Sequence, residues 1–160
     1  MFVPFDALPN SSRVWIYPAS RPFREEEIES LEERLQAFVA QWTAHGTDLK
    51  ASYTIVYRRF LILALNEAAQ AASGCSIDAS VHFIQELENE YDLVLLDKMN
   101  VTYRQGDFLA HKSLADFKKM AKDRAVTKNT VVFNNLVLNK EELENLWEVP
   151  AHQSWHARFF

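Results

Sequence analysis

The clearest pattern along the chain is a series of apolar residues at every third or fourth position between residues 25 and 44. The series consists of Ile28, Leu31, Leu35, Phe38 and Trp42. This spacing places the five side chains on one face of an α-helix. Three glutamates at 25–27 suit the positive end of the helix dipole, and Gly46 supplies a stop signal. We therefore predict a helix over residues 25–44 whose glutamate-rich outer face is solvated.

Strands are predicted before and after this helix. Residues 13–17 are rich in β-branched and aromatic residues and are closed by Pro18, and residues 51–57 have the two-residue period of a half-buried strand. Residues 60–65 are apolar throughout, which indicates a central strand covered on both faces. The connection Arg58-Arg59 lacks the Gly or Asn of a tight hairpin, and this indicates a longer loop.

The same patterns continue to the end of the chain. A helix is expected over residues 77–91, with Ile77, Val81, Ile84 and Leu87 as its buried stripe. The remaining elements are strands at residues 93–96, 99–103, 108–110 and 130–133, and helices that begin after Ser113 and Asn139. The first twelve residues read as an extended arm laid on the domain.

The order of these elements predicts the fold class. Strand, helix, strand, strand, helix, strand is the βαββαβ order of ferredoxin-like domains. We expect one α+β domain over residues 1–160, with this ferredoxin-like core and a C-terminal α/β extension. Trp155, Phe159 and Phe160 are too apolar to leave in water, so we expect the tail to be docked. Such apolar surface also makes a homodimer a plausible partner arrangement.

Composition narrows the classes of protein that the chain can be. One cysteine and the absence of a leader segment indicate a cytoplasmic protein, and no apolar run is long enough to cross a bilayer. The net charge of −5 gives no general attraction to nucleic acid or membranes. The charge is uneven, because residues 24–34 carry six glutamates and two arginines, whereas residues 112–128 carry six basic residues and two aspartates.

Cys75, Asp78 and His82 form the first candidate site. Cys75 is expected just before the helix at residues 77–91, where the helix dipole favours a thiolate. Asp78 and His82 are four residues apart and therefore neighbours on one helical face. A thiol, a base and a carboxylate are the parts of a nucleophilic site in a small enzyme without a cofactor. The structural alternative is that Cys75 packs as a small apolar residue while Asp78, with Ser76, caps the helix.

A second candidate is an anion-binding or RNA-binding surface made of basic residues. Its members are Arg58, Arg59, Lys112, Lys118, Lys119 and Lys122. Tyr53, Tyr57 and Tyr103 would supply rings for base stacking. The acidic net charge and ordinary core packing of such tyrosines argue against RNA. His152 and His156 are also four apart, but no third ligand is near them in sequence, so no metal site is predicted.

Several segments together resemble a known family. They are Ser73-Gly74-Cys75-Ser76-Ile77-Asp78, Ser80-Val81-His82-Phe83, Met99-Asn100-Val101-Thr102, the stretch 111–121, Trp147-Glu148-Val149-Pro150-Ala151 and Ser154-Trp155-His156. With these the chain resembles a family of short bacterial proteins that often carry the label ABC transporter ATPase. The resemblance spans nearly the whole chain but carries no activity over to it.

The residues do not support an ATPase. The phosphate-binding loop needs the pattern G-x-x-x-x-G-K-S/T, and the three glycines at 46, 74 and 106 are far apart and lack it. We therefore expect a non-catalytic binding or assembly module without a cofactor. The alternatives are the enzyme centred on Cys75 and the RNA-binding protein using residues 112–128.

Overall fold

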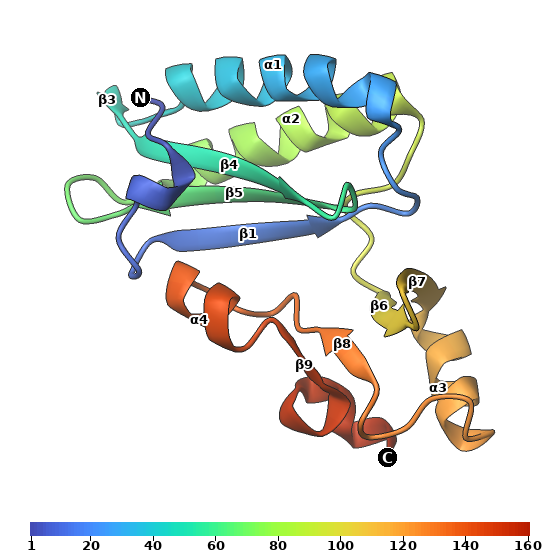
Figure 1. Ribbon diagram of the computed structural model, residues 1–160. Coiled ribbons are helices and arrows are strands. Elements are labelled where there is room, and N and C mark those ends of the chain that lie inside the picture. The colour runs from blue at the N-terminus through green and yellow to red at the C-terminus, as the bar shows by residue number, and fades with distance from the viewer. The chain divides into compact units, whose positions relative to one another are not determined.

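The computed structural model describes residues 1–160, which form two compact units (Figure 1). Unit 1 comprises residues 1–96 and 138–140, and unit 2 comprises residues 97–137 and 141–160. Each unit has its own sheet and its own apolar cluster. The chain is thus an α+β protein with four α-helices and three antiparallel sheets. The single domain expected for residues 1–160 stays a prediction.

Unit 1 is built on a three-stranded antiparallel sheet in the order β1-β5-β4. Its strands are β1 (Arg13–Pro18), β4 (Lys50–Val56) and β5 (Phe60–Asn66). The apolar run predicted to be central is β5, and residues 60–65 are all buried. The helices α1 (Glu25–Gln41) and α2 (Gly74–Tyr91) cover one face of this sheet (Figure 1).

The predicted arm at the start of the chain is confirmed. Its first residues lie along the edge of β4, where the Val3 N–H donates to the Ala51 carbonyl at 2.8 Å and the Ala51 N–H donates to the Met1 carbonyl at 3.1 Å. The arm then forms the short 3-10 helix η1 (Phe5–Ala7). This pairing covers part of an edge strand that would otherwise leave backbone groups open.

Two helix boundaries differ from the prediction. The helix α1 ends at Gln41, and Gly46 is not its stop but part of a turn between β2 (Thr43–Ala44) and β3 (Thr47–Asp48). His45 and Gly46 both have positive φ, which is the backbone of a tight two-residue hairpin. The helix α2 begins at Gly74, because the Ser73 hydroxyl accepts from the Ser76 N–H and the Ser76 hydroxyl accepts from the Ser73 N–H.

The ferredoxin-like βαββαβ sheet is not evident. The strand expected at residues 93–96 is a loop, because the Glu88 carboxylate accepts the backbone N–H groups of Leu95 and Leu96. The strand expected at 99–103 is β6 (Asn100–Gln105), and it belongs to the sheet of unit 2. The main sheet of unit 1 therefore keeps three strands, with β1 and β4 parallel on either side of the antiparallel β5.

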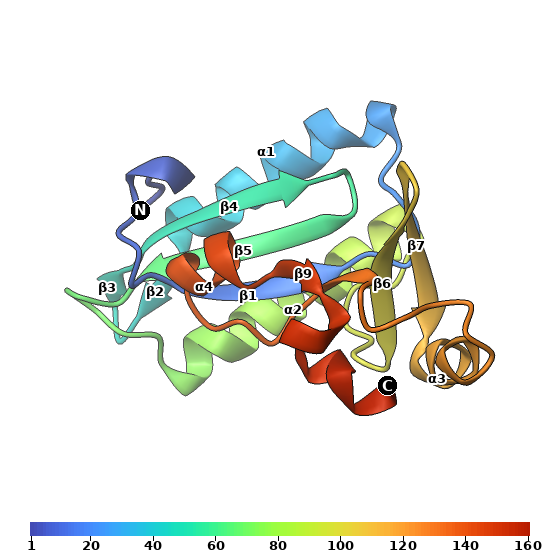
Figure 2. The same ribbon diagram turned by 60° about the horizontal axis from the view of Figure 1, so that its bottom comes forward.

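Unit 2 contains a four-stranded antiparallel sheet in the order β7-β6-β8-β9. The strands besides β6 are β7 (Phe108–Ser113), β8 (Val131–Phe133) and β9 (Glu148–Pro150). The strand β7 lies beside β6 and leads directly into α3 (Leu114–Lys122), as Figure 2 shows. The helix α4 (Lys140–Asn145) begins at the last residue of unit 1, and the remainder of it belongs to unit 2.

The C-terminal tail is ordered and docked within unit 2, as predicted. It forms the 3-10 helices η2 (Ala151–Gln153) and η3 (Trp155–Phe159). Phe117, which is fully buried on α3, meets the ring of Phe159 with centroids 5.9 Å apart and the ring of Phe160 at 6.2 Å. The tail therefore covers the inner face of α3.

Candidate anion-binding site

A hollow in unit 2, with a volume of about 460 Å³, lies where α3 meets the C-terminal tail. We call it the lysine hollow. It is lined by Ala115, Lys118, Lys119, Lys122, Arg158 and Phe159. Four of these six side chains are cations, none is an acid, and most of the surface between them is apolar.

The helical repeat of α3 explains how the first four residues come together. Positions 115, 118, 119 and 122 have the spacing i, i+3, i+4, i+7, so Ala115 and three lysines form one stripe along the helix. The opposite stripe contains Phe117, which is buried, with Leu114 and Met120 packed beside it. Burial of that apolar stripe therefore turns the lysines outward. Lys119 and Lys122 also lie in the last turn, where positive charge is favoured by the helix dipole.

The tail supplies the other wall of the lysine hollow. Arg158 is held by a hydrogen bond from its Nε to the Trp155 carbonyl at 3.3 Å, and its guanidinium lies 5.4 Å from the centre of the Trp155 ring. Phe159 is half-buried and rests on Phe117. The docked aromatic rings thus fix the positions of Arg158 and Phe159 opposite the lysines.

His156 anchors this tail from inside unit 2. Its side chain is fully buried, its ring stacks on Trp155 with centroids 3.8 Å apart, and its Nδ1 shares a 2.6 Å hydrogen bond with the Ser154 hydroxyl. Burial, with a smaller contribution from the charge of Arg158, lowers the pKa of His156 from 6.5 to about 4. The imidazole is therefore neutral at pH 7, and its Nε2 atom is buried without a hydrogen-bond partner.

The two units differ in charge. Unit 1 carries eight basic and fourteen acidic residues, whereas unit 2 carries nine basic and eight acidic residues. The net negative charge of the whole chain therefore comes from unit 1. An anion that approaches the lysine hollow meets a unit that is not acidic overall.

The other basic residues of the predicted surface lie elsewhere. Arg58 and Arg59 are in the hairpin of unit 1, where Arg58 is exposed and Arg59 is buried. Arg59 donates to the Ser20 carbonyl at 3.3 Å, and burial lowers the pKa of its guanidinium. Lys112 is exposed on β7 and does not line the lysine hollow. The structure thus brings together Lys118, Lys119 and Lys122 from the predicted set.

Sequence reasoning missed Ala115, Arg158 and Phe159 as parts of this site. A usable signal was present, because the stripe 115, 118, 119, 122 is visible in the sequence and the aromatic tail was expected to dock. Which surface the tail would cover was not visible, because that depends on contacts between residues about 40 positions apart, such as the ring contact of Phe117 and Phe159.

Cys75, Asp78 and His82 all lie on α2, at the spacing i, i+3, i+7, and all three are exposed. They therefore share one helical face in unit 1. Cys75 is in the first turn of the helix, not before it, and the helix cap is Ser73 instead of Asp78. A nucleophilic site needs its base within hydrogen-bond reach of the thiol, which a shared face alone does not provide.

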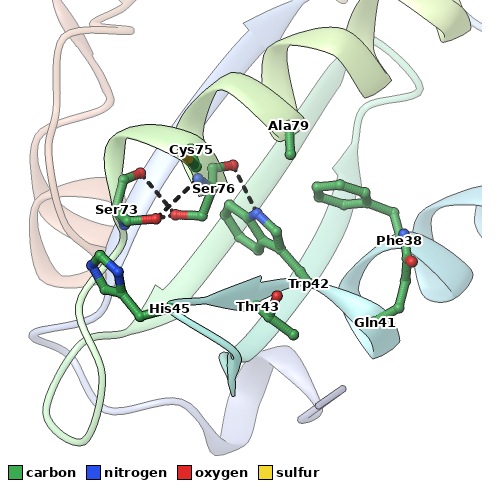
Figure 3. Close-up of a pocket in the computed structure, with 9 residues that line it drawn as sticks. All are labelled: Phe38, Gln41, Trp42, Thr43, His45, Ser73, Cys75, Ser76 and Ala79. Carbon is green, nitrogen blue, oxygen red and sulfur yellow. Dashed lines mark hydrogen bonds between the residues drawn. The ribbon is translucent and has the colours of Figure 1, made fainter.

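Cys75 also lines a second, smaller hollow of about 320 Å³ in unit 1, drawn in Figure 3. Its walls come from the end of α1, the hairpin β2–β3 and the start of α2 (Figure 3). His45 lines this hollow, whereas Asp78 and His82 do not. The Trp42 indole donates to the Ser76 carbonyl at 2.8 Å, which fixes α2 against the end of α1.

The structure contains no group of three or more His, Cys, Asp or Glu side chains placed to hold a metal ion. His152 is exposed and His156 is buried, so the two histidines four residues apart do not present a joint surface. None of the helices has the length and apolar composition needed to span a bilayer.

Comparisons with known proteins do not identify the chain. No protein-family model, no curated protein and no solved structure matches the chain.

Proposed function

We propose that the protein is a non-catalytic binding module whose ligand is an organic anion held in the lysine hollow of unit 2. One observation carries this proposal: Lys118, Lys119, Lys122 and Arg158 surround one concave surface that has no carboxylate among its lining residues. Cations that gather without acids to neutralise them repel one another, and a bound anion removes that repulsion.

The lining residues favour binding over catalysis. Lysine and arginine side chains supply positive charge and hydrogen-bond donors, while Ala115 and Phe159 supply apolar surface. The lysine hollow has no His, Cys, Ser, Asp or Glu that could act as nucleophile or transfer a proton near neutral pH. The lining residues are therefore suited to recognise the charge and the shape of a ligand.

The test uses anilinonaphthalene sulfonate, a fluorescent aromatic anion, as the probe. We expect the folded protein to bind it, and Lys119→Glu to weaken the apparent affinity by about tenfold or more, because reversal of one charge turns an attraction into a repulsion. Lys98→Glu is the matched control, since Lys98 is an exposed lysine of unit 2 outside the lysine hollow. Circular dichroism of each variant verifies that it is folded.

Salt provides an independent readout in the same assay. Exposed charges are screened by salt, so the affinity of the wild-type protein for the probe should fall as sodium chloride rises from 0.05 to about 0.5 M. Equal affinities of the wild-type protein, Lys119→Glu and Lys98→Glu at low salt would contradict the proposal.

A thiol-dependent enzyme in unit 1 is the second candidate. It is supported by an exposed Cys75 that shares a hollow with His45, and by Asp78 and His82 on the same face of α2. We expect such a thiol to react with iodoacetamide well below pH 8, and to react more slowly in His45→Ala or in His82→Ala if that histidine acts as its base. A thiol that reacts only at its ordinary pH in all three proteins argues against the enzyme.

RNA binding through a tyrosine-bearing sheet has weaker support. Tyr103 is buried, and its hydroxyl donates to the Met120 sulfur at 3.6 Å, so its ring has no face open to a base. Tyr53 and Tyr57 lie in unit 1, away from the three lysines of α3 in the sequence and in a different unit. The basic residues alone are the remaining argument for RNA.

A further inference from the structure

The lysine hollow has a second chemical property besides its charge: none of its lining side chains accepts a hydrogen bond. Lysine and arginine are donors only, and the side chains of Ala115 and Phe159 have no polar atom. A ligand with N–H or O–H groups, such as a nucleotide or a sugar phosphate, would leave those donors without a side-chain acceptor where it is covered. A buried polar group without a partner weakens binding.

The apolar part of the lysine hollow favours the opposite kind of ligand. Phe159 presents the half-buried ring, Ala115 leaves the start of the helical stripe open, and the hydrocarbon stems of the lysines add to this surface. Burial of hydrocarbon against such a surface is favourable, whereas burial of a sugar or a base edge is not.

We propose that the ligand is an amphiphilic anion: a carboxylate or phosphate head group attached to a hydrocarbon body without hydrogen-bond donors. The head group is bound by Lys118, Lys119, Lys122 and Arg158, and the body packs on Phe159 and over Ala115. Phe159 is thus the residue that sets the preference for hydrocarbon. This inference rests on the proposed function, because it names the ligand class of the same lysine hollow.

The concave form of the site favours a free amphiphile over a membrane surface. A volume of about 460 Å³ is within the range of small-molecule pockets, and the lysine hollow is a shallow one that stays open to solvent. The lysine hollow is itself a small basic patch of the kind that an anionic bilayer attracts, but unit 2 as a whole has only one more basic residue than acidic residues, so its long-range attraction to such a bilayer is weak.

Isothermal titration with three probes tests the ligand class. We expect decyl phosphate to bind about tenfold or more tightly than adenosine monophosphate or inorganic phosphate, because only decyl phosphate satisfies both the cations and the apolar wall. Lys119→Glu should weaken the binding of decyl phosphate, and Lys98→Glu should leave that binding unchanged. Vesicles of phosphatidylcholine with phosphatidylglycerol should not retain the protein in a flotation assay.

Two variants test the apolar wall. Phe159→Ala should weaken the binding of decyl phosphate several-fold more than it weakens the binding of inorganic phosphate. Because Phe159 also packs on Phe117, Ala115→Trp serves as a second variant that fills the lysine hollow from an exposed position without altering the core. The Ala115→Trp variant should prevent the binding of decyl phosphate.

The outcomes separate the inference from the proposed function. If adenosine monophosphate binds as tightly as decyl phosphate and Lys119→Glu weakens both, the anion site stands and the amphiphile inference is wrong. Binding of the protein to vesicles but not to decyl phosphate would overturn the inference in the same way. If none of the probes, including anilinonaphthalene sulfonate, responds to Lys119→Glu, both proposals fail.

Discussion

At the scale of single residues, His156 shows how a polar side chain can be held inside an apolar cluster. Its ring lies between Trp155 and Phe117, and Ser154 provides its one hydrogen-bond partner. The buried ring cannot take up a proton without a charge being left in a site of low polarity. Its low pKa, about 4, follows from that environment.

This environment predicts how stability depends on pH. A base with a pKa of about 4 in the folded chain and 6.5 in the unfolded chain stays neutral on folding above pH 6.5. The contribution of neutral His156 to the free energy of unfolding is therefore complete above pH 6.5. It is lost as the pH falls from 6.5 towards 4, which lowers the free energy of unfolding by about 3 kcal/mol in all. Thermal melts across this range should show the loss in the wild-type protein, and His156→Phe should flatten it.

His152→Phe is the control for this experiment, because His152 is exposed in the same tail. It should leave the pH dependence unchanged. An acid limb that is equally steep in the wild-type protein and in His156→Phe would mean that other groups control the stability of unit 2 in this pH range.

Leu35 provides the corresponding test for the core of unit 1. It is fully buried in the middle of the predicted stripe of α1, together with Leu31. We expect Leu35→Ala to lower the free energy of unfolding by about 2–5 kcal/mol, because the removed methyl groups leave a cavity. Gln36→Ala, at the exposed neighbouring position, should change it by less than about 0.5 kcal/mol. Urea denaturation measures both values, and a loss below about 1 kcal/mol for Leu35→Ala would indicate a loosely packed stripe.

At the scale of elements, the glycines show how one residue type acts in two ways. Gly46 has φ of 76° in the turn between β2 and β3, whereas Gly74 is the first residue of α2 and has no positive φ. A Cβ atom would meet nothing within 4 Å at either position. A substitution therefore reports on backbone conformation alone, without a steric clash.

We expect the two alanine substitutions to change stability in opposite directions. Gly46→Ala should destabilise the protein by about 1 kcal/mol, because alanine is strained at positive φ. Gly74→Ala should stabilise it by a few tenths to about 1 kcal/mol, because alanine loses less backbone freedom in the helix. Equilibrium unfolding in urea measures both. Equal effects of the two substitutions would contradict the assignment of the turn.

The same elements show what a sequence can predict and where tertiary contacts decide. The stripe of α1 and the apolar run of β5 were predictable because periodicity reports directly on burial. The helix α2 begins three residues before its predicted start, because mutual hydrogen bonds of Ser73 and Ser76 make the cap and Ile77 is only half-buried. The strand predicted at residues 93–96 is wrong, because the Glu88 carboxylate accepts the backbone N–H groups of residues 95 and 96. No local sequence pattern indicates these two hydrogen bonds.

The candidate site was predictable to a similar extent. The lysines of α3 stand out in the sequence as a basic run, and their common face follows from the helical repeat. Arg158 and Phe159 join them through ring contacts between the tail and Phe117, which periodicity does not encode. Conversely, Arg59 was expected on the surface but is buried, because its backbone carbonyl accepts the Ala19 N–H and ties the hairpin to the preceding loop.

At the scale of the whole molecule, the three glycines lie in three separate places: a hairpin turn, the start of α2 and the turn between β6 and β7. A phosphate-binding loop requires glycines close together so that successive N–H groups surround the phosphates. We therefore expect no magnesium-dependent ATP hydrolysis above background in a coupled-enzyme assay. Lys119→Glu, which alters the lysine hollow, should give the same background rate. An activity in the purified protein that disappears in this variant would contradict the expectation.

The docked tail predicts the consequences of truncation for unit 2. Removal of residues 154–160 exposes the ring of Phe117 on the side of the tail, because it takes away the rings of His156, Phe159 and Phe160 and leaves that of Tyr103. One aromatic side chain buries ~150–250 Å², and at ~25 cal/mol per Å² its exposure alone costs about 4–6 kcal/mol before chain entropy offsets part of it. We expect the truncated protein to melt at a lower temperature, with faster hydrogen exchange at the amides of α3.

Truncation also distinguishes the roles of the tail in binding and in assembly. Because Arg158 and Phe159 form one wall of the lysine hollow, the truncated protein should lose affinity for decyl phosphate even at temperatures where it is folded. Sedimentation of the two proteins tests the homodimer that the apolar tail suggested. A dimer that depends on the tail becomes a monomer on truncation, whereas a tail that serves only unit 2 leaves the sedimentation coefficient nearly unchanged. If melting, exchange and binding are all unaffected, then the contacts between the tail and Phe117 contribute nothing in solution, and the lysine hollow loses its second wall.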